Sequence, residues 1–205
     1  MKLITTLFCL FTASLAWGGD GFKPLFNGRD LSGWTVDTPN LWSVRDGMIV
    51  GRSEGMRHND FLRAAGAYQD IILRVKFRLI GGKGNAGIQF RSEAIPNSHE
   101  VSGYQADIGD TYWGCLYDES RRKRVLARPS PEMLAGFKTD GWNQYVITAK
   151  GNVITLDLNG KRTVRWVETE PGIRESGFIA LQVHGGPPME IQYKDIEIRV
   201  LGAGR

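Results

Sequence analysis

Short runs of β-forming residues, separated by turn residues, recur along this chain and constrain its fold more than any other feature. The runs either alternate apolar and polar residues or are rich in valine, isoleucine and aromatic residues, and helical periodicity is nearly absent. Asn159-Gly160, between residues 153–158 and 161–166, is typical of a two-residue hairpin turn. We therefore expect an all-β domain, a sandwich or jelly roll of two antiparallel sheets.

The predicted strands cover most of the chain. They are residues 42–44, 48–51, 70–79, 86–91, 103–108, 114–117, 143–150, 153–158, 161–166, 177–183 and 191–200. Residues 131–136 are predicted to form one short helical turn, and residues 52–62 a loop at the rim of the sandwich. No linker or low-complexity block separates these runs, which indicates one domain.

The first sixteen residues have the features of a secretory signal peptide. Lys2 gives a positive start, residues 3–15 are mostly apolar, and Ser14-Leu15-Ala16 ends in small residues at the positions that signal peptidase reads. The apolar run is too short to span a membrane, and no cysteine stands at the cleavage point, as a lipoprotein would require. We expect residues 1–16 to be removed, and residues 17–205 to form one domain exported to the periplasm or the cell exterior; a buried N-terminal helix is the alternative.

Cysteine content and charge exclude several classes. Once residues 1–16 are removed, Cys115 is the single cysteine, so no intrachain disulfide can form, and a packed thiol is the usual state of such a residue. The chain has 26 basic and 22 acidic residues. Its one dense basic run, residues 121–124, follows two acidic residues and is interpreted as a solvated turn. We therefore expect no nucleic-acid partner.

Three of the predicted strands carry polar side chains on one parity. In residues 86–91, 103–108 and 177–184, apolar residues occupy the other parity, so each strand has one oily and one polar face. If the three strands share a sheet, amides, a carboxylate, a guanidinium and an imidazole line one surface, which suits sugar hydroxyls. The residues on this polar parity are Gln89, Arg91, Gln105, Asp107, Gln182 and His184.

Aromatic side chains follow immediately after the second of these strands. Trp113 and Tyr117 share a parity, and a sugar ring packs its C–H face on an aromatic plane. We expect Trp113 and Tyr117 to line the same cleft.

Seven phrases occur in an order that resembles a known family. They are FNGRDLSGW (26–34), WSVRDG (42–47), GNAGIQFRS (84–92), GYQADI (103–108), GWN (141–143), LNG (158–160) and ALQVH (180–184). Over about residues 22–201 the chain resembles the secreted bacterial 3-keto-disaccharide hydrolase domain family, formerly a domain of unknown function. The resemblance implies a concanavalin A-like, glucanase-type jelly roll that acts on 3-keto-glycosides, sugars already oxidised at C3 by a partner dehydrogenase. Many members carry Gly-Tyr-Glu-x-Gln where this chain has GYQAD, which leaves the exact substrate open.

Such substrates need different catalytic groups from ordinary glycosides. Ordinary glycosidases need two carboxylates, but the segment 105–110 offers one inward carboxylate, Asp107, with Asp110 in the following turn. In a 3-keto sugar the ketone acidifies the hydrogen on C2, so one base can start a β-elimination, with or without later addition of water. His184 or Asp107 is the candidate base, Arg91 the candidate stabiliser of the enolate oxygen. The residues expected to orient sugar hydroxyls are Gln89, Gln105 and Gln182.

Other interpretations stay open. A divalent metal ion held by Asp107 and His184 would act as a Lewis acid on the ketone, although His58, His99 and His184 lack metal-type spacing. No nucleotide, flavin or haem motif is present. The leading hypothesis is an exported enzyme that cleaves 3-keto-glycosides. The alternatives are a non-catalytic, lectin-like carbohydrate-binding module and an ordinary glucanase.

Overall fold

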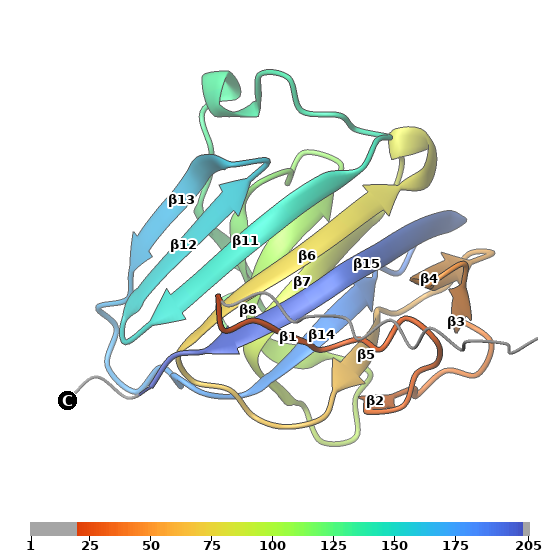
Figure 1. Cartoon of the computed structure of the whole chain (residues 1–205), viewed down its shortest axis with the longest axis horizontal. Helices are drawn as coiled ribbons and strands as arrows, with labels where there is room; N and C mark the ends of the chain where they lie inside the picture. The colour runs from red at the N-terminus through yellow and green to blue at the C-terminus, as the bar shows by residue number, and fades with distance from the viewer. Residues whose placement is uncertain (1–19, 203–205) are drawn as a thin grey trace, which may run out of the picture.

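Two antiparallel sheets, stacked face to face, make up the protein in a computed structural model that describes residues 20–202 (Figure 1). The predicted signal peptide lies outside the described residues. Sheet A has the strand order β13-β12-β11-β6-β15-β4-β3, with β1 also paired to β15, and sheet B has the order β10-β9-β8-β7-β14-β5-β2. The prediction of an all-β, jelly-roll sandwich is confirmed.

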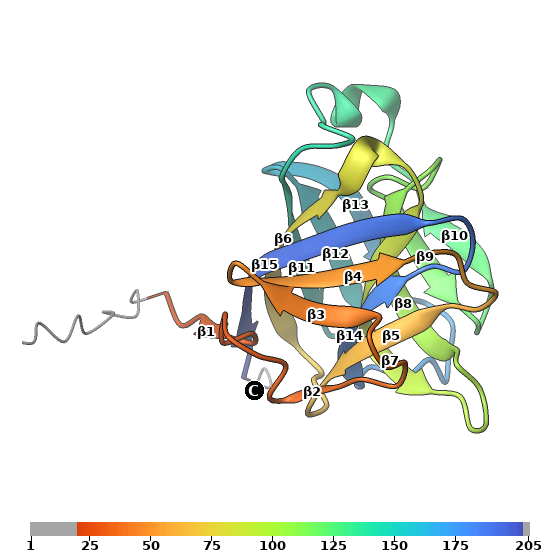
Figure 2. The ribbon, with the colours of Figure 1, turned by 90° about the vertical axis from the view of Figure 1, so that its right-hand side faces the viewer.

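Consecutive strands along the chain often lie in the same sheet: β3 and β4, and β11 to β13, belong to sheet A, and β7 to β10 belong to sheet B. The strands are β1 (Lys23–Pro24), β2 (Trp34–Thr35), β3 (Trp42–Arg45), β4 (Met48–Ser53), β5 (Asp60–Ala64), β6 (Ile71–Leu79), β7 (Asn85–Ala94), β8 (Val101–Gly109), β9 (Leu116–Glu119), β10 (Arg124–Ala127), β11 (Asn143–Lys150), β12 (Val153–Leu158), β13 (Lys161–Val167), β14 (Phe178–Val183) and β15 (Met189–Val200). Two 3-10 turns, η1 (Ile80–Gly82) and η2 (Pro131–Leu134), complete the elements. Figure 2 views the sandwich from the side where β3 and β4 of sheet A lie near β5 of sheet B.

Each of the eleven predicted strands overlaps a strand of the structure, and the hairpin of β12 and β13 around Asn159-Gly160 is confirmed. Four strands were not predicted: β1, β2, β5 and β10. The first two have only two residues each, and β5 lies at the end of the segment expected to be a loop. Such short edge or near-edge strands are defined by their neighbours rather than by a pattern of their own.

The core lies between the sheets and is formed by one face of each strand. In β6, burial alternates residue by residue, and Leu73, Val75 and Phe77 are fully buried. From sheet B, Ile88 and Phe90 of β7 face the same core. Because of this alternation, the remaining side chains of each strand point to the outer face of its sheet, away from the core. Cys115 is buried, and burial raises the pKa of its thiol to about 11, so it is packed rather than nucleophilic.

The basic run at residues 121–124 is not a solvated turn throughout. Arg121 and Arg122 both bind the fully buried carboxylate of Asp118, and Arg122 also binds Glu168 at 2.7 Å. The Tyr104 hydroxyl donates to Glu168 at 2.7 Å. These contacts join the β9–β10 turn to the end of β13. In the part of the chain that the structure describes, no helix has the length and apolar character needed to cross a membrane.

Candidate functional site

The polar face of sheet B is formed by four neighbouring strands, β14, β7, β8 and β9. The three polar strands share this sheet, because β7 pairs with both β14 and β8. Two cross-strand rows define this face. The first row is Ala180, Gln89, Gln105 and Tyr117, and the second is Gln182, Gly87 and Asp107.

A small cavity of about 100 Å³ opens on this face. Four of the predicted site residues line it: Gln105, Asp107, Tyr117 and His184. The other lining residues are Asn85, Tyr112 and Glu119. The walls are therefore almost entirely polar or aromatic, with no aliphatic side chain among them.

A chain of hydrogen bonds fixes the floor of the cavity. Ser92 Oγ donates to Gln89 Oε1 at 2.8 Å, Gln89 Nε2 donates to Gln105 Oε1 at 2.7 Å, and Gln105 Nε2 donates to Asp107 Oδ1 at 3.2 Å. All four residues are buried. Because each amide both accepts and donates, the orientation of Gln105 and of Asp107 is set by the whole chain. Gln89, which was expected to contact substrate, is fully buried and does not line the cavity; it supports Gln105, which does.

The floor is recessed because Gly87 has no side chain. A Cβ atom at Gly87 would lie 2.3 Å from Cδ of Gln105. Gln105 occupies the space that any other residue at position 87 would fill. Beside it, a Cβ atom at Gly103 would lie 2.1 Å from Ser92 Oγ. These two glycines allow the long polar side chains of neighbouring strands to lie flat across the sheet.

The cavity holds two carboxyl groups that resist ionisation. Burial raises the pKa of Asp107 well above its ordinary value, and the nearby charge of Glu119 raises it further. Burial also raises the pKa of Glu119 to about 7, with the charge of Glu100 adding to the effect. Burial therefore disfavours the charged form of Asp107, and Glu119 changes protonation state near neutral pH.

His184 lies at the end of β14, on the exposed rim of the cavity. Its Nδ1 lies 2.5 Å from the carbonyl oxygen of Gly185, and its backbone N–H donates to Asn85 O at 3.2 Å. Gly185 is in turn held by Asn59, whose Oδ1 accepts from the Gly185 N–H at 2.9 Å. A proton on Nδ1 satisfies that carbonyl and leaves a lone pair on Nε2, the tautomer that a general base needs.

Arg91 does not lie on this face, contrary to the parity prediction. The backbone at Arg91 has a φ of 49°, and the register of β7 against β8 shifts between Phe90 and Glu93. This β-bulge reverses the alternation, so that Ser92 rather than Arg91 follows Gln89 on the polar face. The Arg91 side chain, 2% exposed, donates to Gln69 O at 2.9 Å, to Gly151 O at 2.8 Å and to Asp70 at 3.0 Å.

Trp113 is also placed elsewhere. It lies in the turn before β9 rather than in a strand, and its ring packs on Phe137 with centroids 4.5 Å apart. Trp113 is not one of the described residues that line the small cavity. The parity argument paired Trp113 with Tyr117, but a turn residue has no strand parity. Gln182, which was expected to contact substrate, is fully buried in the floor beside Glu119.

Glu119 and Tyr112 are cavity residues that the sequence argument missed. The predicted strand ended at Tyr117, whereas β9 continues to Glu119. Extending the parity of Tyr117 by two residues reaches Glu119, so alternation contained the signal. The interpretation of the next residues as a solvated turn concealed it.

The donor set does not fit a metal ion. Within residues 20–202, no group of three or more histidine, cysteine, aspartate or glutamate side chains is arranged to hold one.

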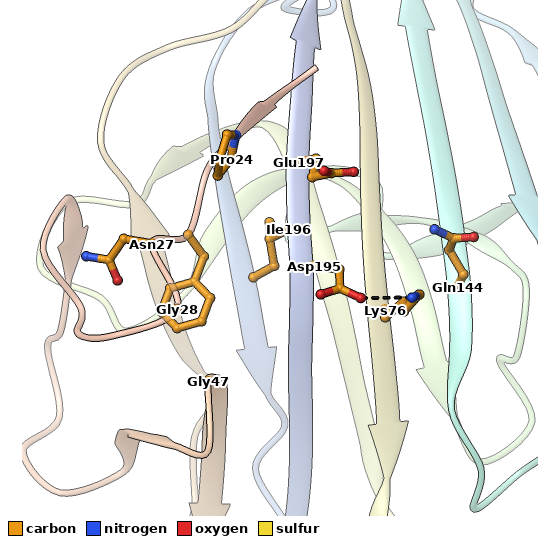
Figure 3. A pocket seen from close by; sticks show the side chains of 10 residues that line it. Pro24, Asn27, Gly28, Gly47, Lys76, Gln144, Asp195, Ile196 and Glu197 are labelled. Atoms are coloured by element: carbon orange, nitrogen blue, oxygen red, sulfur yellow. Dashed lines mark ion pairs between the residues drawn. The ribbon is translucent and has the colours of Figure 1, made fainter. Parts of the chain in front are cut away.

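A larger cavity, of about 460 Å³, lies on the outer face of sheet A (Figure 3). Its charged groups are paired with each other or with neighbours: Lys76 binds Asp195 at 2.8 Å, and Glu197 lies 3.9 Å from Arg74. None of the sequence-predicted site residues lines it. The small cavity on sheet B is therefore the stronger candidate, since its polar groups converge and are buried.

Comparisons with known proteins agree with this architecture. The model of the 3-keto-alpha-glucoside-1,2-lyase-like domain matches residues 21–199. No curated protein matches the chain. A proposed glycosyl hydrolase from Parabacteroides distasonis is similar in structure, with a TM-score of 0.68 at 19% identity, over 88% of this chain and 94% of the other. The carbohydrate-binding module CBM66 of Bacillus subtilis has a TM-score of 0.64 at 16% identity, over 82% of this chain and 95% of the other. At these identities the similarities establish the fold.

Proposed function

Because the chain belongs to the 3-keto-alpha-glucoside-1,2-lyase-like domain family, we propose that it cleaves the glycosidic bond of 3-keto-glycosides. The reaction is a β-elimination at C1 and C2, with or without later addition of water. The small cavity on sheet B is the proposed active site, and His184 is the proposed base. The substrate would be supplied by a dehydrogenase that oxidises a sugar at C3, and the enzyme would meet it after export.

The observation that carries this proposal is the combination of an exposed imidazole with two carboxyl groups whose pKa values are raised by burial. A retaining glycosidase needs an ionised carboxylate as nucleophile, and an inverting one needs an ionised carboxylate as base. The raised pKa values of Asp107 and Glu119 fit neither role. Carboxyl groups with raised pKa values suit an elimination instead, because this reaction needs one base and several neutral hydrogen-bond donors.

In the proposed first step, His184 Nε2 removes the proton from C2. The C–H electron pair forms a C2=C3 double bond, and the ketone oxygen at C3 becomes an enolate. The hydrogen bond from Nδ1 to Gly185 O holds the imidazole and stabilises the imidazolium that forms. Asn59 supports this arrangement by fixing Gly185.

Asp107 takes the role that was assigned to Arg91. A carboxyl group kept neutral by burial can donate a hydrogen bond to an enolate oxygen, and it gains strength in a site with little water. Gln105 Nε2 donates to Oδ1 of Asp107 at 3.2 Å, and the proposed donation to the enolate comes from the protonated carboxyl oxygen of Asp107. The amide of Asn85 and the hydroxyl of Tyr117 line the same cavity and are further donors for the substrate.

The size of the cavity sets how a substrate would bind. Its volume of about 100 Å³ is below the roughly 300–1,000 Å³ of typical ligand pockets. The cavity would hold the reacting edge of one sugar ring, from C1 to C3. The remainder of a disaccharide would lie along the surface of sheet B, which fits an enzyme that accepts several leaving groups.

A non-catalytic carbohydrate-binding module is the second candidate, supported by the similarity to CBM66. The two are separated by incubating the protein with a 3-keto-disaccharide and with the unoxidised disaccharide, and following both by mass spectrometry. Product from the keto form alone supports the enzyme. Binding of both sugars without product supports the module, and hydrolysis of the unoxidised sugar would support an ordinary glucanase.

A further inference from the structure

Glu119 lies at the cavity in a setting that suits proton transfer. Its carboxylate accepts a hydrogen bond from Gln182 Nε2 at 3.5 Å, and it lines the cavity together with His184. Gln182 is fully buried, and its Oε1 has no hydrogen-bond partner among the described residues. An unpartnered buried amide oxygen is costly unless another state of the site satisfies it.

The amide of Gln182 can serve both protonation states of Glu119. When Glu119 is ionised, the Gln182 NH₂ group donates to it, as observed. When Glu119 is protonated, rotation of the amide by half a turn brings Oε1 to accept the carboxylic O–H. This one amide therefore keeps a partner for Glu119 before and after it gives up a proton.

We propose that Glu119 donates the proton to the leaving-group oxygen in the second step of the elimination. This inference rests on the proposed function. The enolate oxygen re-forms the C3=O double bond, the electron pair of C2=C3 moves to form C1=C2, and the bond from C1 to the glycosidic oxygen breaks. That oxygen takes the proton of Glu119 and leaves as an alcohol. The proton taken from C2 stays on His184. His184 later releases this proton to solvent, and Glu119 takes up a proton from solvent, so that both groups return to their starting states.

Glu119 suits this role better than the other acids of the cavity. Asp107 is more deeply buried and is tied to Gln105 at 3.2 Å. Tyr117 is a weaker acid than a carboxyl group, and burial raises the pKa of its hydroxyl. Glu119 is half-buried and stands on the edge side of β8, where a leaving sugar can extend along the sheet.

The test compares leaving groups. Glu119→Gln keeps the shape and the contact with Gln182 but has no proton to give. On a 3-keto-disaccharide, whose leaving group must be protonated, we expect kcat/KM to fall about 10²–10⁴-fold. On 4-nitrophenyl 3-keto-glucoside, whose leaving group is a stable anion, we expect a loss of less than about tenfold. The matched control is Glu93→Gln, which changes an exposed carboxylate paired with Arg174.

Equal losses on both substrates would overturn the role of Glu119 and leave the proposed function standing. If the wild-type protein cleaves neither substrate, the proposed function fails and the role of Glu119 fails with it. Should Glu119→Gln not fold, a series of aryl 3-keto-glucosides tests the wild-type enzyme. A rate that depends weakly on the acidity of the leaving phenol supports proton donation, and a steep dependence contradicts it.

Discussion

The amide of Gln182 lies 3.5 Å from the carboxylate of Glu119, although strands β7 and β8 separate their own strands in sheet B. The intervening strands present Gly87 opposite Gln182 and Gly103 opposite Glu119, so the residue directly beside each of the two has no side chain. Strands β14 and β9 are therefore linked by a side-chain hydrogen bond across the face of the sheet, in addition to the backbone ladder through β7 and β8. The geometry of the floor, rather than any single motif, brings the candidate catalytic groups together.

Replacing His184 with alanine should abolish proton abstraction. Because the side chain is exposed, we expect little change in thermal stability and a fall in kcat of about 10²–10⁴-fold. The measurement is release of the leaving sugar from a 3-keto-disaccharide. The control is His99→Ala, another exposed histidine, which stacks on His58. Unchanged turnover by His184→Ala would remove His184 from the base role.

A methyl group at position 87 should displace the hydrogen-bonded side chains of the cavity floor while the backbone of β7 keeps its strand conformation. In Gly87→Ala, the new Cβ would meet Gln105 at 2.3 Å, so Gln105 must move and release Asp107. We expect kcat/KM to fall at least tenfold, with a loss of stability of about 1–3 kcal/mol from overpacking. Gly202→Ala, where nothing lies within 4 Å of the added atom, is the control. Full activity in Gly87→Ala would show that the position of Gln105 is irrelevant.

Arg91 should matter for stability and not for chemistry. Its guanidinium bridges Gln69, Asp70 and Gly151, and removing it leaves Asp70 partly buried without its cation. We expect Arg91→Ala to lower the free energy of unfolding by about 3–5 kcal/mol, with kcat per folded molecule within a few-fold of the wild type. Urea unfolding and active-site titration measure the two quantities. The surface control, Arg162→Ala, removes a pair that is 53% exposed on the arginine side. If Arg91→Ala unfolds like the wild type but loses kcat, Arg91 would again be the candidate stabiliser of the enolate oxygen.

The rate on a 3-keto-disaccharide should fall at alkaline pH. Glu119 must be protonated to act as an acid, and its raised pKa of about 7 means that this form is present below that pH and lost above it. We expect kcat/KM to fall about tenfold per pH unit above the pKa. The titratable groups around Glu119 are Glu100, Asp118, Asp107 and Tyr117. A pH profile of the wild type and of Glu119→Gln measures the effect, and an alkaline limb that persists in the variant would contradict it.

Alternation in the sequence was sufficient to predict the strands that support the site. Gln105 and Asp107 lie on the face that their parity predicted, opposite Tyr104 and Ala106 in the core. Hairpin chemistry at Asn159-Gly160 likewise determined the pairing of β12 with β13. These features depend on local patterns that a sheet preserves.

Arg91 and Glu119 show where local pattern failed. A bulge at a non-glycine residue leaves no mark in the sequence, and the side chain of Arg91, which has a positive φ, contacts three residues that lie far away in the chain. Glu119 was hidden because β9 has only four residues and is followed by a charged turn. In both cases the structure is decided by partners far away in the chain, which pattern alone does not reveal.

The most direct test of the central claim is a single comparison of substrates. The purified protein is incubated separately with a 3-keto-disaccharide, with the same sugar deuterated at C2 and with the unoxidised disaccharide, and each reaction is followed by mass spectrometry. We expect cleavage of the keto form alone, a slower rate for the deuterated than for the protonated substrate, and loss of deuterium from the sugar product. Cleavage of the unoxidised disaccharide at a similar rate, or retention of deuterium at C2 in the product, would contradict elimination at this site.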